Sequence, residues 1–238
     1  MTTEHIRCLQ RYLGCEPDGI RGPKTTMAIK QWQRRWALEE TGVPDLKLWL
    51  TLWRECGVDV CWDPYSLTHW GKRVRPIRGI VIHHSDTATP AQTARILQAR
   101  KLSTHFEVSA TGQVYQYGDP LDWVAWHAQV PNGTSIGIDL THRGLTAPFP
   151  KAQIDAAGRL IATLCRLHGL QPRISAARAW DRSSDHPLRT LGAGADERPV
   201  ALWSDGAGVT LHRQWAATAC PGPLDIDALQ AAIDDLPW

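Results

Sequence analysis

Apolar residues recur at helical spacing through the first 55 residues, with turn-forming residues between the runs. Ile6, Leu9 and Leu13 stand at i, i+3 and i+7, which predicts an amphipathic helix over residues 4–13. We therefore expect a small three-helix domain over residues 1–56. The apolar positions of its second and third helices are Ala28, Ile29, Trp32 and Trp36, and then Leu46, Trp49, Leu50 and Trp53.

The pattern changes after residue 56. Residues 57–75 hold scattered charges without clear periodicity, and we interpret them as a linker. Over residues 76–238, short apolar runs alternate with amphipathic segments, and this alternation predicts an α/β domain. The expected strands lie at 80–82, 106–108, 114–117, 135–140 and 209–211, and the expected helices lie at 90–101, 151–168 and 225–235.

Charge and hydropathy exclude two classes of partner. The net charge is +2, from 26 Lys and Arg against 24 Asp and Glu, which is too even for a protein that binds nucleic acid mainly by neutralising phosphates. No stretch approaches the ~18 uninterrupted apolar residues of a membrane span. We expect neither nucleic acid nor a membrane as a partner. The 12 tryptophans, against 4 tyrosines and 2 phenylalanines, suit stacking against sugar rings.

Two histidines and a cysteine are the candidate metal ligands. His83 follows a short apolar run, His212 follows another, and Cys220 stands eight residues later, before Pro221-Gly222. Two imidazoles and one thiolate make a three-ligand zinc set that leaves a fourth position for water. Spacing alone leaves a second interpretation open, in which these residues are core histidines and a buried free cysteine. The N-terminus shows no secretory signal, so we expect the six cysteines to stay reduced.

Motifs of the second half, in the same order along the chain, resemble those of the zinc N-acetylmuramoyl-L-alanine amidases. This family includes the peptidoglycan recognition proteins and phage lysozymes of the amidase type. The resemblance covers roughly residues 76–235 and implies a mixed central β-sheet flanked by helices. It is carried by His83 to Thr87, Thr104 to Val108 with Thr111 to Gln116, Trp126-His127-Ala128 with Asn132 and Ser135 to Leu140, and Leu211 to Trp215 with Thr218 to Gly222.

The resemblance implies roles for individual residues. Zn²⁺ would be held by His83, His212 and Cys220. Asp139 stands where many members have the glutamate that activates water, and its alternative is a structural strand carboxylate. Thr218 stands where some phage members have a lysine that stabilises the oxyanion, and a hydroxyl supplies only a neutral hydrogen bond there.

Four other positions in this half are less settled. His127 is expected to hydrogen-bond substrate or the tetrahedral intermediate, with a structural histidine as the alternative. His84 is expected to be structural or at the rim of the site, because adjacent strand residues face opposite ways. Thr104 replaces a tyrosine that some members place near the metal. Residues 174–208 have no counterpart in the family, and His186 within them is a weak rival ligand.

The first domain resembles the three-helix peptidoglycan-binding module over roughly residues 4–55. The resemblance is carried by Ile6 to Gln10, Leu13-Gly14, Pro17 to Ile20, Gly22 to Thr26 and Ala28 to Gln33. Together the two resemblances imply a peptidoglycan hydrolase of the endolysin type, which cleaves the amide between the lactyl group of N-acetylmuramic acid and L-alanine. The sequence does not give the oligomeric state, and a monomer is the expectation. The missing signal implies that it resides in the host bacterial cytoplasm before it reaches the cell wall. A cytosolic muropeptide-recycling amidase and a non-catalytic peptidoglycan receptor are the alternatives.

Overall fold

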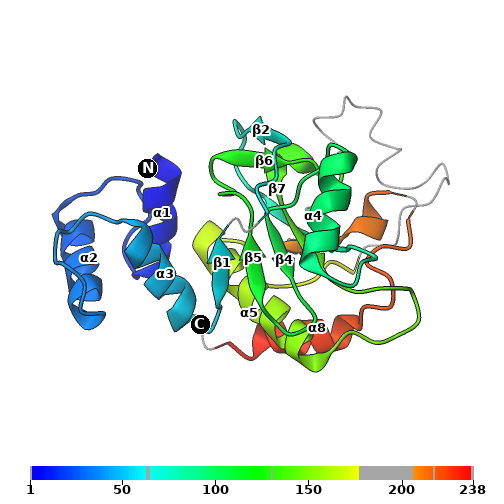
Figure 1. Ribbon diagram of the computed structural model, residues 1–238. Coiled ribbons are helices and arrows are strands. Elements are labelled where there is room, and N and C mark those ends of the chain that lie inside the picture. Colours follow the sequence, from blue (N-terminus) through cyan, green and yellow to red (C-terminus); the bar gives the residue numbers. More distant parts are fainter. Residues whose placement is uncertain (1, 63–64, 130, 177–205, 217, 237–238) are drawn as a thin grey trace.

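The computed structural model describes residues 2–62, 65–129, 131–176, 206–216 and 218–236. Within these ranges a small helical module lies beside a larger α/β domain (Figure 1). None of the helices in the described part of the chain combines the length and apolarity that a bilayer span requires. The weak rival ligand His186, and most of the unmatched stretch 174–208, lie outside the described residues.

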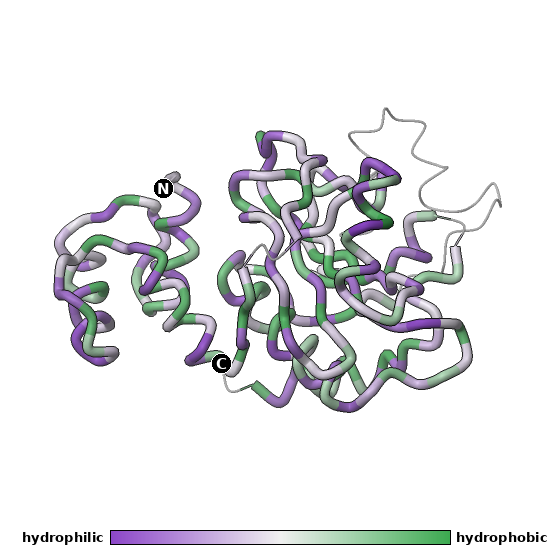
Figure 2. The backbone as a smooth tube through the Cα atoms, in the orientation of Figure 1, coloured by the Kyte–Doolittle hydropathy of each residue, from purple (hydrophilic) through white to green (hydrophobic). Residues whose placement is uncertain are grey.

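The N-terminal module consists of three helices, as the spacing predicts. They are α1 (Thr3–Tyr12), α2 (Pro23–Arg35) and α3 (Leu46–Glu55). The side chains of Thr2 and Asp45 cap the first and third helices by accepting hydrogen bonds from backbone amides. The second helix begins with proline, which has no N–H. This costs nothing in the first turn, where a backbone N–H has no acceptor within the helix. In Figure 2 hydrophobic and hydrophilic residues alternate along these helices, as amphipathic packing requires.

Two buried glutamines hold the loops of this module. The Gln10 amide donates to the Asp18 side chain (2.7 Å) and to the carbonyl of Ile20 (3.0 Å), and its oxygen accepts from the backbone amide of Gly19 (2.8 Å). Gln33 repeats the arrangement nine residues before Gly42, whose amide it accepts at 2.8 Å. At Gly19 φ is +80°, and a Cβ there would approach a Thr3 methyl within 2.4 Å, so only glycine fits this turn.

The α/β domain is built on a six-stranded mixed sheet in the order β1-β5-β4-β7-β3-β8. β4 pairs antiparallel with β5, whereas β7 runs parallel to β4 and to β3, and β8 runs parallel to β3. This confirms the mixed central sheet. The strands are β1 (Val60–Trp62), β3 (Gly79–His84), β4 (Phe106–Val108), β5 (Val114–Gln116), β7 (Ser135–Leu140) and β8 (Val209–Leu211).

The two faces of the sheet differ in chemistry. On one face, Ile80 and Ile82 of β3 lie in register with Ile136 and Ile138 of β7, and all four are fully buried. They share one hydrophobic core with the inner side of α5 (Lys151–His168), against which α8 (Ile226–Asp234) packs. Gly169 ends α5 with φ of 66°, as its position predicts. The other face carries polar residues, and side chains of α4 (Pro90–Ala99) line one cavity together with them.

The segment 57–75, interpreted above as a linker, is part of the folded α/β domain. β1 pairs in parallel with β5 at the edge of the main sheet. A second segment, β2 (Trp70–Lys72), forms a two-stranded antiparallel sheet with β6 (Trp123–Ala125). The linker interpretation was wrong because three-residue strands are too short to show a period of their own, and their partners lie more than 50 residues away.

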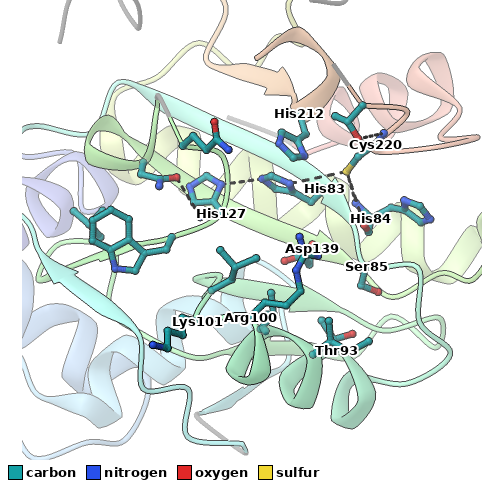
Figure 3. A pocket seen from close by; sticks show the side chains of 18 of the residues that line it. His83, His84, Ser85, Thr93, Arg100, Lys101, His127, Asp139, His212 and Cys220 are labelled. Atoms are coloured by element: carbon teal, nitrogen blue, oxygen red, sulfur yellow. Dashed lines mark hydrogen bonds between the residues drawn. The ribbon is translucent and has the colours of Figure 1, made fainter. Parts of the chain in front are cut away.

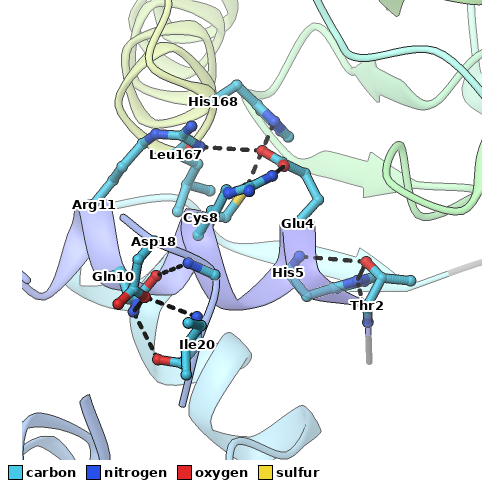
Figure 4. A network of polar contacts seen from close by, with 12 residues as sticks. Thr2, Glu4, His5, Cys8, Gln10, Arg11, Asp18, Ile20, Leu167 and His168 are labelled. Atoms are coloured by element: carbon cyan, nitrogen blue, oxygen red, sulfur yellow. Dashed lines mark hydrogen bonds and ion pairs between the residues drawn. The ribbon is translucent and has the colours of Figure 1, made fainter. Parts of the chain in front are cut away.

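The module is docked on the α/β domain through α1 and α5 (Figure 4). The Arg11 guanidinium donates to the carbonyl of Leu167 (3.0 Å). Arg166 donates in return to the carbonyl of Tyr12 (3.2 Å). A third link joins the His5 ring to Asp119 at 2.9 Å. Buried residues of the module belong to the same apolar cluster as the sheet, and Trp53 packs edge-on against Phe106. The module is therefore held in a fixed position beside the sheet.

Candidate metal centre

The polar face of the sheet carries a row of ionisable side chains near the carboxyl ends of its parallel strands. His83 on β3 lies in register with Asp139 on β7, which in turn lies in register with Glu107 on β4. Residues in register on neighbouring strands project to the same face, so these three side chains lie next to one another. His212 follows directly after β8 and enters the site from the strand on the far side of β3.

The three expected ligands converge. One donor atom from each of His83, His212 and Cys220 lies within 4.8 Å of the other two. The Nδ1 of His83 lies 4.0 Å from the Cys220 sulfur, and the rings of His83 and His212 have centroids 4.4 Å apart. The Cys220 sulfur also accepts the backbone amide of His84 at 3.1 Å, a contact that stabilises a thiolate. Figure 3 shows the three side chains meeting at one wall of a cavity of about 1170 Å³.

Burial sets the protonation of these donors. It holds the pKa of His83 well below its ordinary value, with the neighbouring His212 and His127 adding to the effect. Burial likewise lowers the pKa of His212 to about 4 and raises the pKa of the Cys220 thiol to about 12. Both imidazoles are therefore neutral at pH 7, each with a lone pair to offer. A divalent cation would displace the thiol proton on binding, as is usual for cysteine ligands.

A hydrogen-bond chain fixes which nitrogen of His83 is bare. The Ser135 hydroxyl donates to the carbonyl of Pro131 (2.7 Å), which can only accept. Ser135 must then accept from the Nε2 of His127 (3.1 Å), so the Nδ1 of His127 carries a lone pair. That Nδ1 lies 2.8 Å from the Nε2 of His83, which must therefore carry the hydrogen. The bare nitrogen of His83 is Nδ1, the atom that faces Cys220.

This tautomer is the one a metal ligand needs. An imidazole that donates its N–H to a fixed acceptor presents its other nitrogen, correctly oriented, to the ion. Two neutral nitrogens and one sulfur are also the donor types that zinc prefers, and three protein ligands leave a position open for water or substrate. The residues present therefore fit zinc.

The chain of hydrogen bonds gives His127 a place different from the one expected for it. Both of its ring nitrogens are engaged, one with His83 and one with Ser135. Its ring lies over Gly137, where a Cβ would come within 2.7 Å of it, so any side chain at position 137 would displace the ring. His127 therefore supports His83, and its expected hydrogen bond to substrate would require one of these bonds to break.

Asp139 lies beside the donors, with only 7% of its surface exposed. The pKa of Asp139 is raised to about 7, mostly by burial and also by the nearby Glu107, while a hydrogen bond with Thr104 opposes the rise. Glu107 is itself fully buried, and it accepts from the hydroxyls of Tyr117 (2.6 Å) and Thr141 (2.5 Å). A carboxyl group with a pKa near 7 can take up and release a proton at neutral pH.

Thr218 and His84 lie at the rim of the same cavity. Thr218 is exposed on the loop that leads to Cys220, where its hydroxyl accepts the amide of Cys220 at 3.2 Å. The His84 side chain points away from the ligands (Figure 3) and packs near His142 and Phe149, with both ring nitrogens buried and without a hydrogen-bond partner among the described residues. The alternation along β3 thus separates the two histidines as expected.

Sequence reasoning missed two supporting residues. Ser135 ends the hydrogen-bond chain, and Gly137 leaves room for the His127 ring. Both lie in the segment Ser135–Leu140, which carried the resemblance. Side chains of this strand alternate between the two faces of the sheet, and this alternation shows which of its residues share a face with Asp139. Gly137 stands two residues before Asp139, on the same face, so a missing side chain there indicates that something large lies over the strand.

Two family models match the sequence of this chain. A family model described as N-acetylmuramoyl-L-alanine amidase matches residues 73–223, and one described as a peptidoglycan binding domain matches residues 2–52. A search of the curated proteins finds no match.

Two solved structures share the fold. N-acetylmuramoyl-L-alanine amidase LysC from Clostridium intestinale URNW is 18% identical, with a TM-score of 0.52, over 74% of this chain and 97% of that one. Endolysine N-acetylmuramoyl-L-alanine amidase LysCS from the same organism has the same identity and TM-score, over 74% and 95%. Because the amidase family model spans more than half of the sequence, this chain belongs to the N-acetylmuramoyl-L-alanine amidase family, with a peptidoglycan-binding domain in front of the amidase domain.

Proposed function

We propose that this protein is a zinc-dependent peptidoglycan hydrolase that cleaves the amide between the lactyl group of N-acetylmuramic acid and L-alanine. The observation that carries the proposal is the convergence of His83, His212 and Cys220 beside the buried Asp139. Three ligands with one open position, next to a carboxylate that can move a proton, are what hydrolysis of an unactivated amide requires. The family match supplies the substrate class.

Each residue of the site has its own role in the proposed reaction. A zinc ion bound by the three ligands would supply Lewis-acid polarisation of the scissile carbonyl and acidify a water molecule. Asp139 takes the proton of the attacking water and returns it to the leaving amine of L-alanine. Thr218, exposed beside Cys220, offers a neutral hydrogen bond to the oxygen that becomes negative. His127 and Ser135 keep the His83 ring in its ligating orientation.

The N-terminal domain is proposed to bind peptidoglycan and so to raise the enzyme's concentration at the wall. Its docking on α5 gives this binding a defined geometry, because Arg11 and Arg166 fix the module relative to the sheet. A bound glycan strand would then lie at a set distance from the catalytic groove. A flexible tether would impose no such spacing.

Digestion of purified peptidoglycan tests the proposed reaction. The expected products are new L-alanine amino termini without new reducing sugars, formed by zinc-loaded protein and lost in Asp139→Asn. New reducing sugars would instead mark a glycosidase. Binding to the wall without any release of amino termini would favour the alternative of a non-catalytic receptor. Retention of all three ligand side chains speaks against that alternative.

A further inference from the structure

The groove that holds the metal ligands has a basic side. Its acidic lining residues are Asp139, which lies buried beside the ligands, and Asp86, which accepts the backbone amide of Gly144 at 2.9 Å. Among the described residues, neither forms an ion pair with Lys72, Arg100 or Lys101. The cationic lining residues are Lys72, Arg75, Arg100 and Lys101.

Two of these cations stand together at the end of α4. Arg100 is the residue that closes the helix and Lys101 follows it, and both are exposed. Figure 3 places them on the α4 side of the cavity, across from Cys220 and His84. Lys72, at the end of β2, adds a third charge from another element.

These three side chains have no counter-charge of their own. In the ranges that the structure describes, neither a hydrogen bond nor an ion pair engages the side chains of Lys72, Arg100 or Lys101. Cations near a helix C-terminus complement the helix dipole, which accounts for a basic residue at the end of α4. It does not account for Lys72, which lies on a strand and lines the same groove. Several unpaired cations that line one groove are complementary to an anionic ligand.

The chemistry of the proposed substrate says which part of it is anionic. The N-acetylated sugars of the glycan are uncharged, and the lactyl carboxyl is consumed in the scissile amide. The residue that follows L-alanine in the stem peptide carries a free α-carboxylate, unless the wall is amidated at that residue. Negative charge therefore begins on the leaving-group side of the amide, one residue from the bond that is cut.

We propose that Arg100 and Lys101, with Lys72, form a subsite for the free carboxylate of the stem-peptide residue next to L-alanine. This inference rests on the proposed amidase function and adds a substrate preference to it. The leaving peptide runs from the metal ligands toward the C-terminal end of α4, and the sugar lies on the other side of the ligands. The enzyme distinguishes stem peptides that contain D-isoglutamate from those that contain D-isoglutamine. Only the first carries the negative charge that Arg100, Lys101 and Lys72 attract.

Two soluble muramoyl peptides that differ only in D-isoglutamate against D-isoglutamine test the subsite. With the full-length, zinc-loaded protein we expect kcat/KM to be about tenfold higher for the acid, since two partly exposed ion pairs contribute about this much together. In the double variant R100Q/K101Q the ratio should fall to near one through a rise in KM for the acid, with kcat unchanged. The preference of the wild type should also shrink as salt is raised.

Arg95→Gln is the matched control. Arg95 is exposed on the same helix but does not line the groove, so its loss removes an equal charge and should keep the tenfold preference. Unchanged cleavage of the amidated peptide by R100Q/K101Q shows that the variant is folded. A wild-type ratio near one, an unchanged ratio in the double variant, or an equal loss on both peptides would overturn the subsite.

Calorimetric binding of the same two peptides separates this inference from the proposed function. If the wild type cleaves neither peptide, the amidase proposal fails. The subsite then still stands if the acid binds about tenfold more tightly than the amide and R100Q/K101Q abolishes the difference. Equal binding of both peptides, or binding of neither, would contradict it.

Discussion

The N-terminal module and the metal centre are held together in opposite ways. In the module, Gln10 and Gln33 each clamp a loop that begins within nine residues of them. In the metal centre, His83 is linked to His127, 44 residues away, and to Cys220, 137 residues away. The module is thus specified by local contacts, whereas the metal centre exists only once strands from the whole second half have paired.

This difference predicts that substitutions in the two regions have different effects on stability, metal affinity and activity. Loss of a clamp in the module should lower stability and leave the metal centre intact. Loss of a contact in the metal centre should change metal affinity or activity, with little effect on the module, because the ligands lie at a groove wall and outside the apolar core. The following variants, ordered by expected effect, test that separation.

Cys220→Ala should have the largest effect. It removes the only sulfur of the ligand set, and loss of several kcal/mol of transition-state stabilisation corresponds to a fall in kcat of about 10³-fold or more. The measurement is release of L-alanine amino termini, with zinc content determined on the same sample. Cys15→Ala, in a loop of the module, is the control and should retain full activity. Undiminished release of L-alanine amino termini by Cys220→Ala would exclude Cys220 as a ligand.

Ser135→Ala should weaken metal binding and keep the three ligands in place. Without the hydroxyl, the Nε2 of His127 loses its acceptor and the tautomer of His83 is no longer fixed. Changes at such supporting residues lower metal affinity about 10–100-fold. Competition with a chelator measures the zinc affinity, and the visible spectrum of the cobalt-loaded protein reports the ligand geometry. Ser109→Ala is the control and should keep the zinc affinity of wild type. If Ser135→Ala also keeps that affinity, the hydrogen-bond chain does not orient His83.

Gln10→Ala should destabilise the module by about 1–3 kcal/mol. It removes the acceptor of the Gly19 amide and one of the donors to the Ile20 carbonyl, and a donor left without its partner costs about this much. Calorimetric unfolding measures the loss, and chelator competition should show unchanged zinc affinity. Gln31→Ala, exposed on α2, serves as the control. A fall in zinc affinity would show that module and metal centre are coupled more tightly than their contacts indicate.

Acid should loosen the interface between the two regions by a smaller amount. Burial of Asp119 would raise its pKa, but hydrogen bonds from His5 and from the Leu121 amide outweigh this and hold the pKa below its ordinary value. A carboxylate whose pKa is lowered by folding stabilises the fold above its unfolded-state pKa, and this stability is lost as the pH falls through the folded-state pKa. We expect a loss of about 1 kcal/mol.

Thermal unfolding of wild type and Asp119→Asn between pH 7 and pH 3 isolates this contribution. The difference in free energy of unfolding between the two proteins should shrink as the pH falls, because protonation of Asp119 removes the same charge as the substitution. A constant difference across that range would show that the His5–Asp119 contact does not depend on the carboxylate charge.

Much of the fold could be read from the sequence, and the reasons for the gaps are physical. A helix such as α5 is predicted by the apolar stripe along its 18 residues and by Gly169 at its C-terminal end. β1, β2 and β6 have three residues each, so their identity depends on partners rather than on a period. Two of the hydrogen bonds that dock the module end on the backbone carbonyls of Tyr12 and Leu167, which carry no sequence signal.

By itself, the sequence determined the elements with strong periodicity, the donor types of the metal site and the order of the motifs, because these reside in side-chain chemistry and local spacing. Tertiary structure alone decided that His127 supports a ligand, that Ser135 ends its hydrogen-bond chain, and that cations from β2 and α4 line the same groove. Such facts depend on distances between residues tens of positions apart, and only the pairing of the strands sets those distances.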